Sequence, residues 1–596
     1  MSQQRQFSFG YLPDVPAIED YTIHDVKKEL PKGLISDLNK VDDPAVPNSE
    51  VLPTLVDNRK YCSAIQEQGS LGSCFTGDTL ITMGNLSEKM IKDIEIGEKV
   101  SNKYGQQKRV TRKYERNYTG ELYKIRFRGY DTTIACTEEH PFFIKHFTRH
   151  WNGLVSEKES WMLAKNIDLS DRPRITIPKL IRENPSCNTI SIRKFIEEEC
   201  HYDPETNKVW TIGSKQKYAL PENFELTSDF ARFLGLFLAE GSYRKDNCGE
   251  IQGINLTFNR KNDSQYIDFI DKLFKTMFDI NIEIKKTEKR PSIIDVTISN
   301  KTLSSLIKKL CGEYSFGKEL SPILFDQPKE VKISLLRGWL EGDGWTKKAL
   351  YKSSRSENKI RLQKSGVTIS EKLCRGLMRL ALSCDIKSTF VKKINNKYGK
   401  SMSYTLNFYG EGVFKIFPEY RELESMIDHK NMNKYKEDDK NFYCEITSIE
   451  KTYVENIPVY NLEVEDDHEY IANLCLVHNC TSQASVSMME YMQKKVYGSY
   501  QDGSRLFVYW QTRKYMGDQY LTVDSGAYNR LTMKTIAKYG IPEEVNWKYN
   551  IADFAKKPPQ EVFDDAESNV ALKYFRLDGD SVYGEAYTNR IKTFLY

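Results

Sequence analysis

The sequence predicts a multidomain α+β protein in which an all-β domain is interrupted by a larger insert. At 596 residues the chain is too long for a single hydrophobic core. Short β-like runs bounded by Gly, Asn and charged turns fill residues 75–180 and return at 442–479. Between them, helical-period stretches at 229–239, 262–279 and 330–340 alternate with strand-like text such as SIIDVTIS. The two β-rich segments therefore look like halves of one discontinuous domain.

Composition excludes several classes of protein. The chain is 39% hydrophobic and 29% charged, with 20 Pro and 33 Gly, which excludes wholesale disorder and collagen. No apolar run approaches the ~20 residues of a membrane span, and the first residues do not resemble a signal peptide. The 12 Cys lack a disulfide-like spacing, so we expect reduced thiols. We expect a soluble protein in the cytoplasm or another intracellular compartment, with no membrane partner.

The charge is unevenly distributed. Residues 181–440 contain 45 Lys and Arg against 36 Asp and Glu, a net charge of +9, and the remaining residues carry −5. A basic segment 181–440 within an otherwise acidic chain indicates a polyanionic partner for this segment alone. A solvated, lysine-rich surface is the alternative that charge by itself favours.

A motif broken into two pieces is the most informative feature. The text QGSLGSC ends at Cys74, and CTSQASVSMMEYM begins at Cys480; deleting the 406 residues 74–479 joins the two pieces. The joined text resembles the nucleophile region of papain-like cysteine peptidases, where a Gly-Ser-Cys turn opens the central helix. This resemblance implies that Cys480 is the peptidase nucleophile. It also implies that Gln68, six positions earlier in the joined chain, is the glutamine of the oxyanion hole.

The removed piece carries motifs of its own. CFTGDTLITM starts at Cys74, TEEHPFF contains Thr137 and His140, and WMLAKNI is followed by TIPK. VYNLEVEDDHEYIAN and LCLVHNC then end the piece at Cys480. In this order the motifs resemble the blocks of an intein with the hedgehog/intein splicing fold. The resemblance implies autocatalytic excision of residues 74–479.

The first implied step makes a peptide bond reactive. Cys74 attacks the carbonyl of Ser73 and moves the acyl group from nitrogen to sulfur. Thr137 and His140 orient that amide and protonate its leaving nitrogen. Cys480 then attacks the thioester and forms a branched intermediate.

The last implied step cuts the chain at its other end. Asn479 cyclises to a succinimide, and His478 and His468 assist by proton transfer. A spontaneous S-to-N shift restores an amide. The family often has an acidic residue where this chain has Asn461, and Asn cannot accept a proton, so we expect weaker coordination of the first two steps.

Two copies of one pattern lie in the basic middle, FLGLFLAEG at 233–241 and LLRGWLEGDG at 335–344. They resemble the paired LAGLIDADG motifs of homing endonucleases, which implies an αββαββ repeat that binds double-stranded DNA at the uninterrupted host gene. The resemblance implies that Glu240 and Asp343 hold Mg²⁺ at the scissile phosphates. It also implies that Lys318, in YSFGKELSP, stabilises charge or polarises water.

These motifs divide the chain into consecutive segments. They are a host segment 1–73, splicing regions 74–180 and 441–479, an endonuclease insert 181–440, and a second host segment 480–596.

The joined host has 190 residues and keeps a single histidine, His24, since none follows Cys480. Papain-like peptidases place their histidine about 130–150 residues after the cysteine. We therefore expect a truncated host, without activity on a peptide substrate from this chain alone. Two alternatives stay open: a cysteine peptidase homologue with a non-splicing DNA-binding insertion, and a nucleic-acid-binding protein without chemistry.

Overall fold

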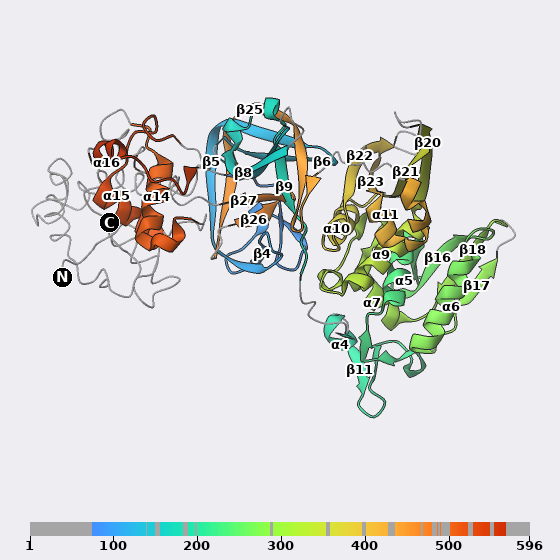
Figure 1. Cartoon of the computed structure of the whole chain (residues 1–596). Coiled ribbons are helices and arrows are strands. Elements are labelled where there is room, and N and C mark those ends of the chain that lie inside the picture. Colours follow the sequence, from blue (N-terminus) through green and yellow to red (C-terminus); the bar gives the residue numbers. More distant parts are fainter. Residues whose placement is uncertain are drawn as a thin grey trace, which may run out of the picture.

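The computed structural model describes most of the chain from Cys74 onward (Figure 1). The described residues are 74–138, 140–149, 155–182, 189–196, 199–286, 290–352, 358–395, 401–426, 436–465, 469–478, 486, 489, 501–522, 529–548 and 553–567. Gln68, His468, Asn479 and Cys480 lie outside this set, as do the side chain of His478 and most of the helix expected after Cys480.

Strands from both β-rich segments form one domain, which we call the β domain. Its strands are β1 (Phe75–Thr76), β2 (Leu80–Thr82), β3 (Glu88–Met90), β4 (Lys99–Ser101), β5 (Gln107–Phe127), β6 (Tyr130–Thr137), β7 (Pro141–Arg149), β8 (Val155–Leu163), β9 (Arg174–Pro178), β24 (Lys436–Glu437), β25 (Asn441–Val464), β26 (Glu469–Ala472) and β27 (Cys475–His478). Strands β5 and β25 pair antiparallel along almost their whole length, from Ile446 opposite Phe127 to Val464 opposite Val110. The two long strands are the frame on which the shorter strands assemble.

The chain leaves the β domain and returns to it at neighbouring positions. Pro178 of β9 pairs with Asn441 of β25, and the Lys179 N–H donates to the Lys440 carbonyl at 2.9 Å. Residues 189–426, which we call the insert, therefore occupy a loop whose two ends already lie side by side. Such an insertion costs the β domain little, because loop-closure entropy grows slowly with length.

The insert begins with a small β-rich region and continues with two similar halves. The small region contains β10 (Thr189–Ser191), α4 (Ile192–Phe195), β11 (Cys200–Asp203), β12 (Lys208–Thr211), β13 (Leu220–Pro221) and β14 (Asn223–Glu225). The first half contains α5 (Ser228–Glu240), β15 (Gly241–Lys245), β16 (Ile251–Asn259), α6 (Ser264–Phe278), β17 (Glu283–Lys286), β18 (Ile293–Ile298) and α7 (Lys301–Cys311). After β19 (Gly312–Glu313) and α8 (Tyr314–Gly317), the second half contains α9 (Lys329–Gly342), β20 (Gly344–Lys352), β21 (Asn358–Thr368), α10 (Glu371–Leu382), β22 (Ser388–Asn395), β23 (Ser401–Tyr409) and α11 (Glu411–Ile416).

The two halves share one topology. The first sheet has the order β15-β16-β18-β17, and in the second β20 pairs with β21, β21 with β23, and β23 with β22. Each half therefore places its strands in the same order after its leading helix. The predicted helices at 229–239, 262–279 and 330–340 are confirmed as α5, α6 and α9, and SIIDVTIS contains β18.

Helices α5 and α9 cross at very short range. A Cβ added to Gly235 would lie 2.2 Å from the Leu335 carbonyl oxygen, and one added to Gly338 would lie 1.9 Å from the Arg232 carbonyl oxygen. Any larger residue at either position would push the helices apart. The helix N-terminus of α5 is fixed by Thr227, whose side chain accepts from the Phe230 N–H. The two helix C-termini consequently lie next to each other.

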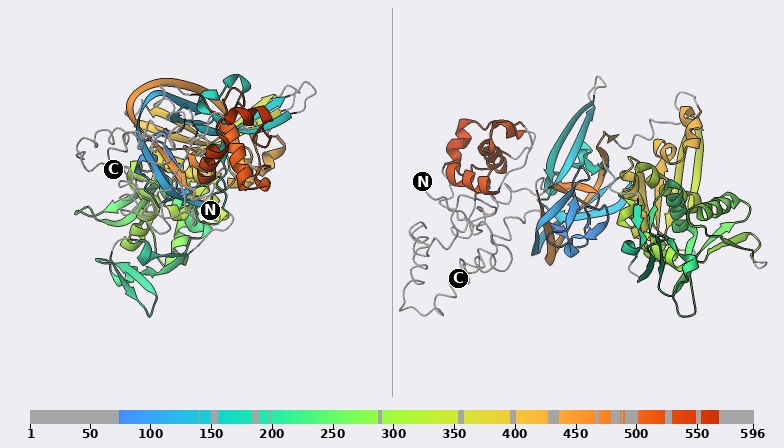
Figure 2. Two further views of the ribbon diagram at one scale, coloured as in Figure 1. Left: turned by 90° about the vertical axis from the view of Figure 1, so that its left-hand side faces the viewer. Right: turned by 90° about the horizontal axis from the view of Figure 1, so that it is seen from below.

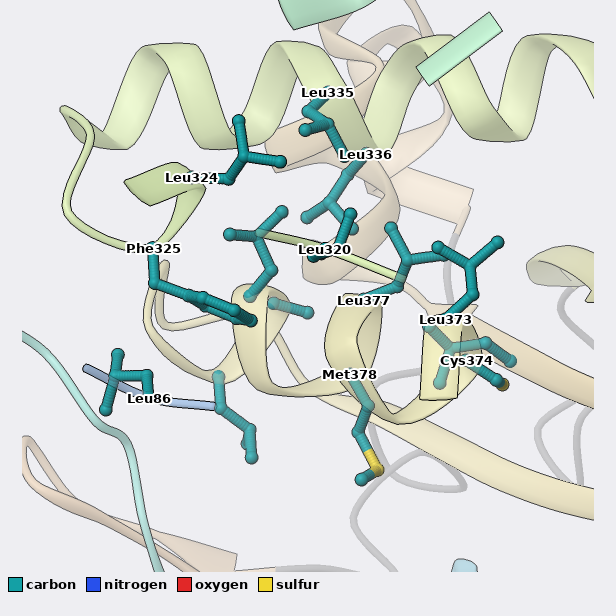
Figure 3. Packing of buried hydrophobic residues seen from close by; sticks show 14 of the residues in the cluster. Leu86, Leu320, Leu324, Phe325, Leu335, Leu336, Leu373, Cys374, Leu377 and Met378 are labelled. Atoms are coloured by element: carbon teal, nitrogen blue, oxygen red, sulfur yellow. The ribbon is translucent and has the colours of Figure 1, made fainter. Parts of the chain in front are cut away.

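A buried ion cluster joins the insert to the β domain. Arg375 of α10 donates to both carboxylate oxygens of Glu88 in β3, at 2.8 and 2.7 Å, and Arg379 also pairs with Glu88. Arg379 further donates to the Leu86 carbonyl at 2.8 Å. Burial alone raises the pKa of the Glu88 carboxyl, but the two guanidinium groups outweigh burial and lower it to about 2. Figure 3 shows Leu86 facing Phe325 across the same contact.

The C-terminal helices form a separate core. They are α14 (Arg505–Met516), α15 (Asn529–Tyr539) and α16 (Gln560–Ala566), and they bury Phe507, Val508 and Ile536 among others. Figures 1 and 2 show the β domain between these helices and the insert. Among the described helices, none combines the length and apolar character needed to cross a bilayer.

Replacing Glu88 should loosen this junction. Glu88→Gln leaves two buried guanidinium groups without a counter-charge, and we expect a loss of about 3–5 kcal/mol in the free energy of unfolding. Because the folded-state pKa lies below its ordinary value, the contribution of Glu88 is complete above about pH 4.5 and disappears as pH falls through about 2. Urea titrations at pH 7 and pH 3 measure both effects.

Glu98→Gln is the matched control, because Glu98 forms a partly exposed pair with Lys89 in the same domain. We expect less than about 1 kcal/mol from this change. Equal effects of the two substitutions on the free energy of unfolding would show that the Glu88 cluster contributes no more than an exposed ion pair.

Candidate functional site

The backbone N–H and the backbone carbonyl of Cys74 are both hydrogen-bonded to Thr137. The Cys74 N–H donates to Thr137 Oγ1 at 2.9 Å, and the Thr137 N–H donates to the Cys74 carbonyl at 2.9 Å. Both residues are buried. The position arises because β1 lies between β6 and β25, with Phe75 opposite Cys136 on one side and Tyr460 on the other. The nitrogen of Cys74, which would leave in an N-to-S acyl shift, thus points at a hydroxyl.

His140 lies against the same segment. Its backbone N–H donates to the Thr137 carbonyl at 3.2 Å, and its fully buried ring packs on Phe75 with 3.9 Å between ring centroids. The structure therefore brings Cys74, Thr137 and His140 together, as their sequence motifs imply.

Arg116 is a site residue that motif reasoning missed. It lies on β5 opposite Val459, and Val459 packs with Cys74 in one buried cluster. Burial raises the pKa of the Cys74 thiol, whereas the charge of Arg116 and its side-chain hydrogen bond to Cys74 lower it; the net result is a pKa of about 11. Arg116 is thus placed to favour the thiolate. No sequence motif marks Arg116; the strand pairing alone places it opposite the VYNL block.

Asn461 connects to Cys74 through Tyr470, a second residue that motif reasoning missed. The buried Asn461 Oδ1 accepts from the Tyr470 hydroxyl and from the Leu462 N–H, both at 2.8 Å. Burial raises the pKa of Tyr470 well above its ordinary value, and the nearby Cys74 raises it further. The amide of Asn461 therefore serves as an acceptor that orients Tyr470.

The two ends of the segment meet at β7. Val477 of β27 pairs with Phe142 of β7, and the ring of Phe142 lies 6.4 Å from that of Phe75. The backbone of His478 pairs with Glu469. The chain just before Asn479 therefore arrives beside the strand that follows His140.

A pair of carboxylates lies at the adjacent ends of α5 and α9. Glu240 ends α5, and Asp343 directly follows α9. Burial, followed by the charge of Glu240, raises the pKa of Asp343 to about 7. Burial, followed by the charge of Asp263, raises the pKa of Glu240. Two carboxylates whose ionisation is disfavoured in a partly buried site are suited to a divalent cation, which would favour the charged form of both.

The two carboxylates suit a hard cation that takes only part of its ligands from the protein. No group of three or more His, Cys, Asp or Glu that could hold a metal occurs in the part of the chain that the structure describes. Glu240 and Asp343 would therefore supply two oxygen ligands, and carbonyl, water or phosphate oxygens would supply the rest. Mg²⁺ commonly binds in this way, through one or two carboxylates plus substrate phosphates.

Lys318 is buried beside this pair and holds the end of α5. Its ammonium donates to the carbonyls of Phe237 at 3.2 Å, Leu238 at 2.9 Å and Gly241 at 2.9 Å, which flank Glu240. Burial lowers the pKa of Lys318, whereas Asp343 and Glu240 raise it. Polarisation of water by Lys318 remains a prediction, since its three ammonium hydrogens have carbonyl acceptors here.

The model of the intein splicing domain matches residues 76–479, about two thirds of the chain. The chain belongs to the intein splicing domain family. This intein-containing chain is 24% identical over 517 residues to an uncharacterized protein of Methanocaldococcus jannaschii, covering 79% of this chain and 57% of the relative. It therefore spans little more than half of that relative's length.

Two further similarities cover smaller shares of the intein-containing chain. An uncharacterized peptidase C1-like protein of Acanthamoeba polyphaga mimivirus is 41% identical over 75 residues, 13% of this chain and 24% of that protein. Mesophilic variants of the homing endonuclease I-DmoI are similar in structure at 14% identity and a TM-score of 0.24, over 34% of this chain and 97% of theirs.

Removing the guanidinium group beside Cys74 should slow the first splicing step. In an Asn479→Ala background, we expect Arg116→Met to slow thiol-induced cleavage at Ser73 about tenfold at pH 8, because one unit of thiol pKa changes the thiolate fraction tenfold. The pH of half-maximal rate should move upward, and Arg116→Lys should recover part of the rate. Cleavage followed by gel electrophoresis between pH 6 and 11 measures this.

Arg126→Met is the control, because Arg126 lies on the same strand but is largely exposed and pairs with Glu450. An unchanged pH profile in Arg116→Met would show that Arg116 does not act on the thiol.

Proposed function

We propose that the chain is a self-splicing precursor in which residues 74–479 excise themselves and Ser73 becomes joined to Cys480. The observation that carries this proposal is the hydrogen bond from the Cys74 N–H, which belongs to the Ser73–Cys74 peptide bond, to Thr137 Oγ1. A hydroxyl that accepts from the leaving nitrogen fixes the orientation of that amide. The family match supports the same chemistry.

The first step transfers an acyl group. The Cys74 sulfur attacks the carbonyl carbon of Ser73, the carbon–nitrogen bond breaks, and the nitrogen takes a proton with the help of Thr137 and His140. Arg116 favours the attacking thiolate. The product is a thioester between Ser73 and Cys74.

The remaining steps exchange and release the ends. The Cys480 thiol attacks the thioester and displaces the Cys74 thiol, which gives a branched chain. The Asn479 side-chain nitrogen attacks its own backbone carbonyl, forms a succinimide and releases the amine of Cys480, assisted by His478 and His468. That amine then displaces the sulfur of Cys480 and leaves an ordinary peptide bond.

Substitution at the two ends should separate these steps. We expect Cys74→Ala to abolish joining but to permit cleavage after Asn479, because cyclisation needs no thioester. We expect Asn479→Ala to accumulate a species that added thiol cleaves at Ser73. Mass spectrometry of the products measures both.

Cys248→Ala is the control for loss of a thiol, since Cys248 is exposed in the insert. It should splice like the unsubstituted chain. A joined 190-residue product from both Cys74→Ala and Asn479→Ala would refute the splicing proposal.

We further propose that the predicted endonuclease segment 181–440, which contains the insert, is a site-specific DNA endonuclease. Support comes from two halves of one topology, the glycine-mediated contact of α5 with α9, and the carboxylates at their ends. When bound, Mg²⁺ would neutralise charge at the scissile phosphates. Glu240 and Asp343 would hold it, and the net charge of +9 would attract duplex DNA. The expected target is the uninterrupted host gene at the codons of Ser73 and Cys480.

Loss of either carboxylate should separate cutting from binding. We expect Glu240→Gln and Asp343→Asn each to lower the cleavage rate at least a hundredfold, because each removes a cation ligand with little change of shape. Binding to the target duplex should persist and should weaken steeply with salt. Plasmid cleavage and electrophoretic mobility shifts measure the two properties.

Glu250→Gln, at an exposed acid paired with Lys301, should cut normally. Cutting that survives both Glu240→Gln and Asp343→Asn would place the active site elsewhere.

We propose that the joined host segments form the nucleophile-bearing part of a papain-like cysteine peptidase that acts on peptides. The similarity to a peptidase C1-like protein over 75 residues supports this. Cys480 would be the nucleophile and Gln68 the oxyanion-hole donor. Excision would bring the two into one chain segment, so the peptidase site would form only after splicing.

A further inference from the structure

One aromatic side chain of the β domain packs against the second host segment. Trp161 of β8 lies against the buried cluster of Leu506 and Tyr509 on α14, together with Trp547 and Phe554. Among the described members of this cluster, Trp161 alone comes from the β domain. In Figure 1, α14 lies on the side of the C-terminal helices that faces the β domain. The splicing domain and the host therefore meet through an apolar contact.

Helix α14 uses opposite faces for its two contacts. Phe507 and Val508 pack into the core that α14 shares with α15 and α16. Leu506 and Tyr509 are three residues apart, so they lie together on the other side of the helix. The contact with Trp161 thus uses a face that the main host core leaves available, and excision of the intein would remove Trp161 from it.

Trp161 is held in place by its own strand pair. It lies opposite Phe143 of β7, and the two ring centroids are 5.0 Å apart. The neighbouring Phe142 is buried in the core of the β domain, so Phe143 and Trp161 point away from that core. The next pair on this face, Lys145 with Glu159, is an ion pair at 2.8 Å. The apolar part of this face of β7 and β8 is therefore centred on the two rings.

The downstream splice junction lies on a short segment between these contacts. Val477, before the junction, pairs with Phe142 of β7. Val486, after the junction, is fully buried in the host core with Phe507. Nine positions separate Val477 from Val486, and such a segment spans at most about 30 Å. Both of its ends are thus attached to the pair of strands β7 and β8, one by strand pairing and the other through α14 and Trp161.

We propose that Trp161 is a positioning residue that docks the second host segment on the β domain and thereby holds the Asn479–Cys480 peptide bond for cleavage. This inference rests on the proposed splicing function. It adds a dependence on this host, because the partner of Trp161 is the face formed by Leu506 and Tyr509. Fixing both ends of a short segment removes conformations in which its reacting groups lie apart.

The first test measures cleavage after Asn479 in the full-length Cys74→Ala chain, in which joining cannot occur. We expect Trp161→Ala and Tyr509→Ala each to slow this cleavage at least fivefold. The two changes together should slow it no more than either alone, because both remove the same contact. Trp161→Phe should recover most of the rate. Gel electrophoresis at timed intervals measures all four.

The second test measures docking without cleavage. In the full-length chain that carries both Cys74→Ala and Asn479→Ala, we expect Trp161→Ala to raise hydrogen exchange of the α14 backbone amides at least threefold. Loss of a packing contact lowers the free energy of local opening. Mass spectrometry of peptides that cover Arg505–Met516 measures the exchange.

Two substitutions provide matched controls. Tyr453→Ala removes a ring that is 64% exposed on β25 of the β domain, and it should change neither cleavage nor exchange. Phe563→Ala removes a ring that lies 5.0 Å from Phe507 on the opposite face of α14. Its effect on cleavage should multiply with that of Trp161→Ala, because the two rings do not share a contact.

The outcomes separate this inference from the splicing proposal. Unchanged exchange of α14 in Trp161→Ala would show that Trp161 does not dock the host, and the inference would be wrong. The inference would also be wrong if the cleavage rate stayed the same, or if the effects of Trp161→Ala and Tyr509→Ala multiplied; in both cases the splicing proposal stands. If the Cys74→Ala chain does not cleave after Asn479, the splicing proposal fails and the positioning role fails with it, even where exchange shows the docking contact.

Discussion

The hydrogen bonds between the Cys74 backbone and Thr137 are the interaction on which the site in the β domain depends. Strand β1 has only two residues, and it is held by pairs to β6 on one side and to β25 on the other. The strands β6 and β25 belong to different β-rich segments, so β1 is paired on both sides only when the two segments have folded together. The first segment contributes Cys74, Thr137 and His140, and the second contributes Asn461 and Tyr470, so the complete arrangement needs both segments.

The insert leaves this arrangement intact because the chain leaves and re-enters the β domain at neighbouring residues. The pairing of Pro178 with Asn441 closes the β domain whether the intervening loop is short or long. The cluster of Glu88 with Arg375 and Arg379 then adds a specific junction. Two different environments result: a buried thiol whose pKa is raised, and a half-buried pair of acids beside a lysine. Each suits its proposed chemistry, acyl transfer in one and cation binding in the other.

Sequence motifs predicted the elements and residues whose spacing is local. Helical periodicity located α5, α6 and α9, and the Thr-x-x-His spacing joined Thr137 to His140. The two repeated motifs lie on α5 and α9, and Gly235 and Gly338 within them allow the close contact of these helices.

Contacts between distant segments had no such signal. Arg116 and Tyr470 lie on strands that reach Cys74 only through the pairing of the β domain, and single positions on long strands carry no motif. The partners of Lys318 are backbone carbonyls, which sequence does not distinguish. Glu88 and Arg375 are separated by 287 positions and became partners through the docking of whole domains.

The most direct test of the central claim is the mass of the freshly expressed chain. Excision with joining predicts two species of about 47 and about 22 kDa, in proportion to 406 and 190 of 596 residues in 69.3 kDa. It also predicts a peptide with Ser73 bonded directly to Cys480 in the smaller species. A single stable species of 69.3 kDa, with Ser73 still bonded to Cys74, would contradict the account.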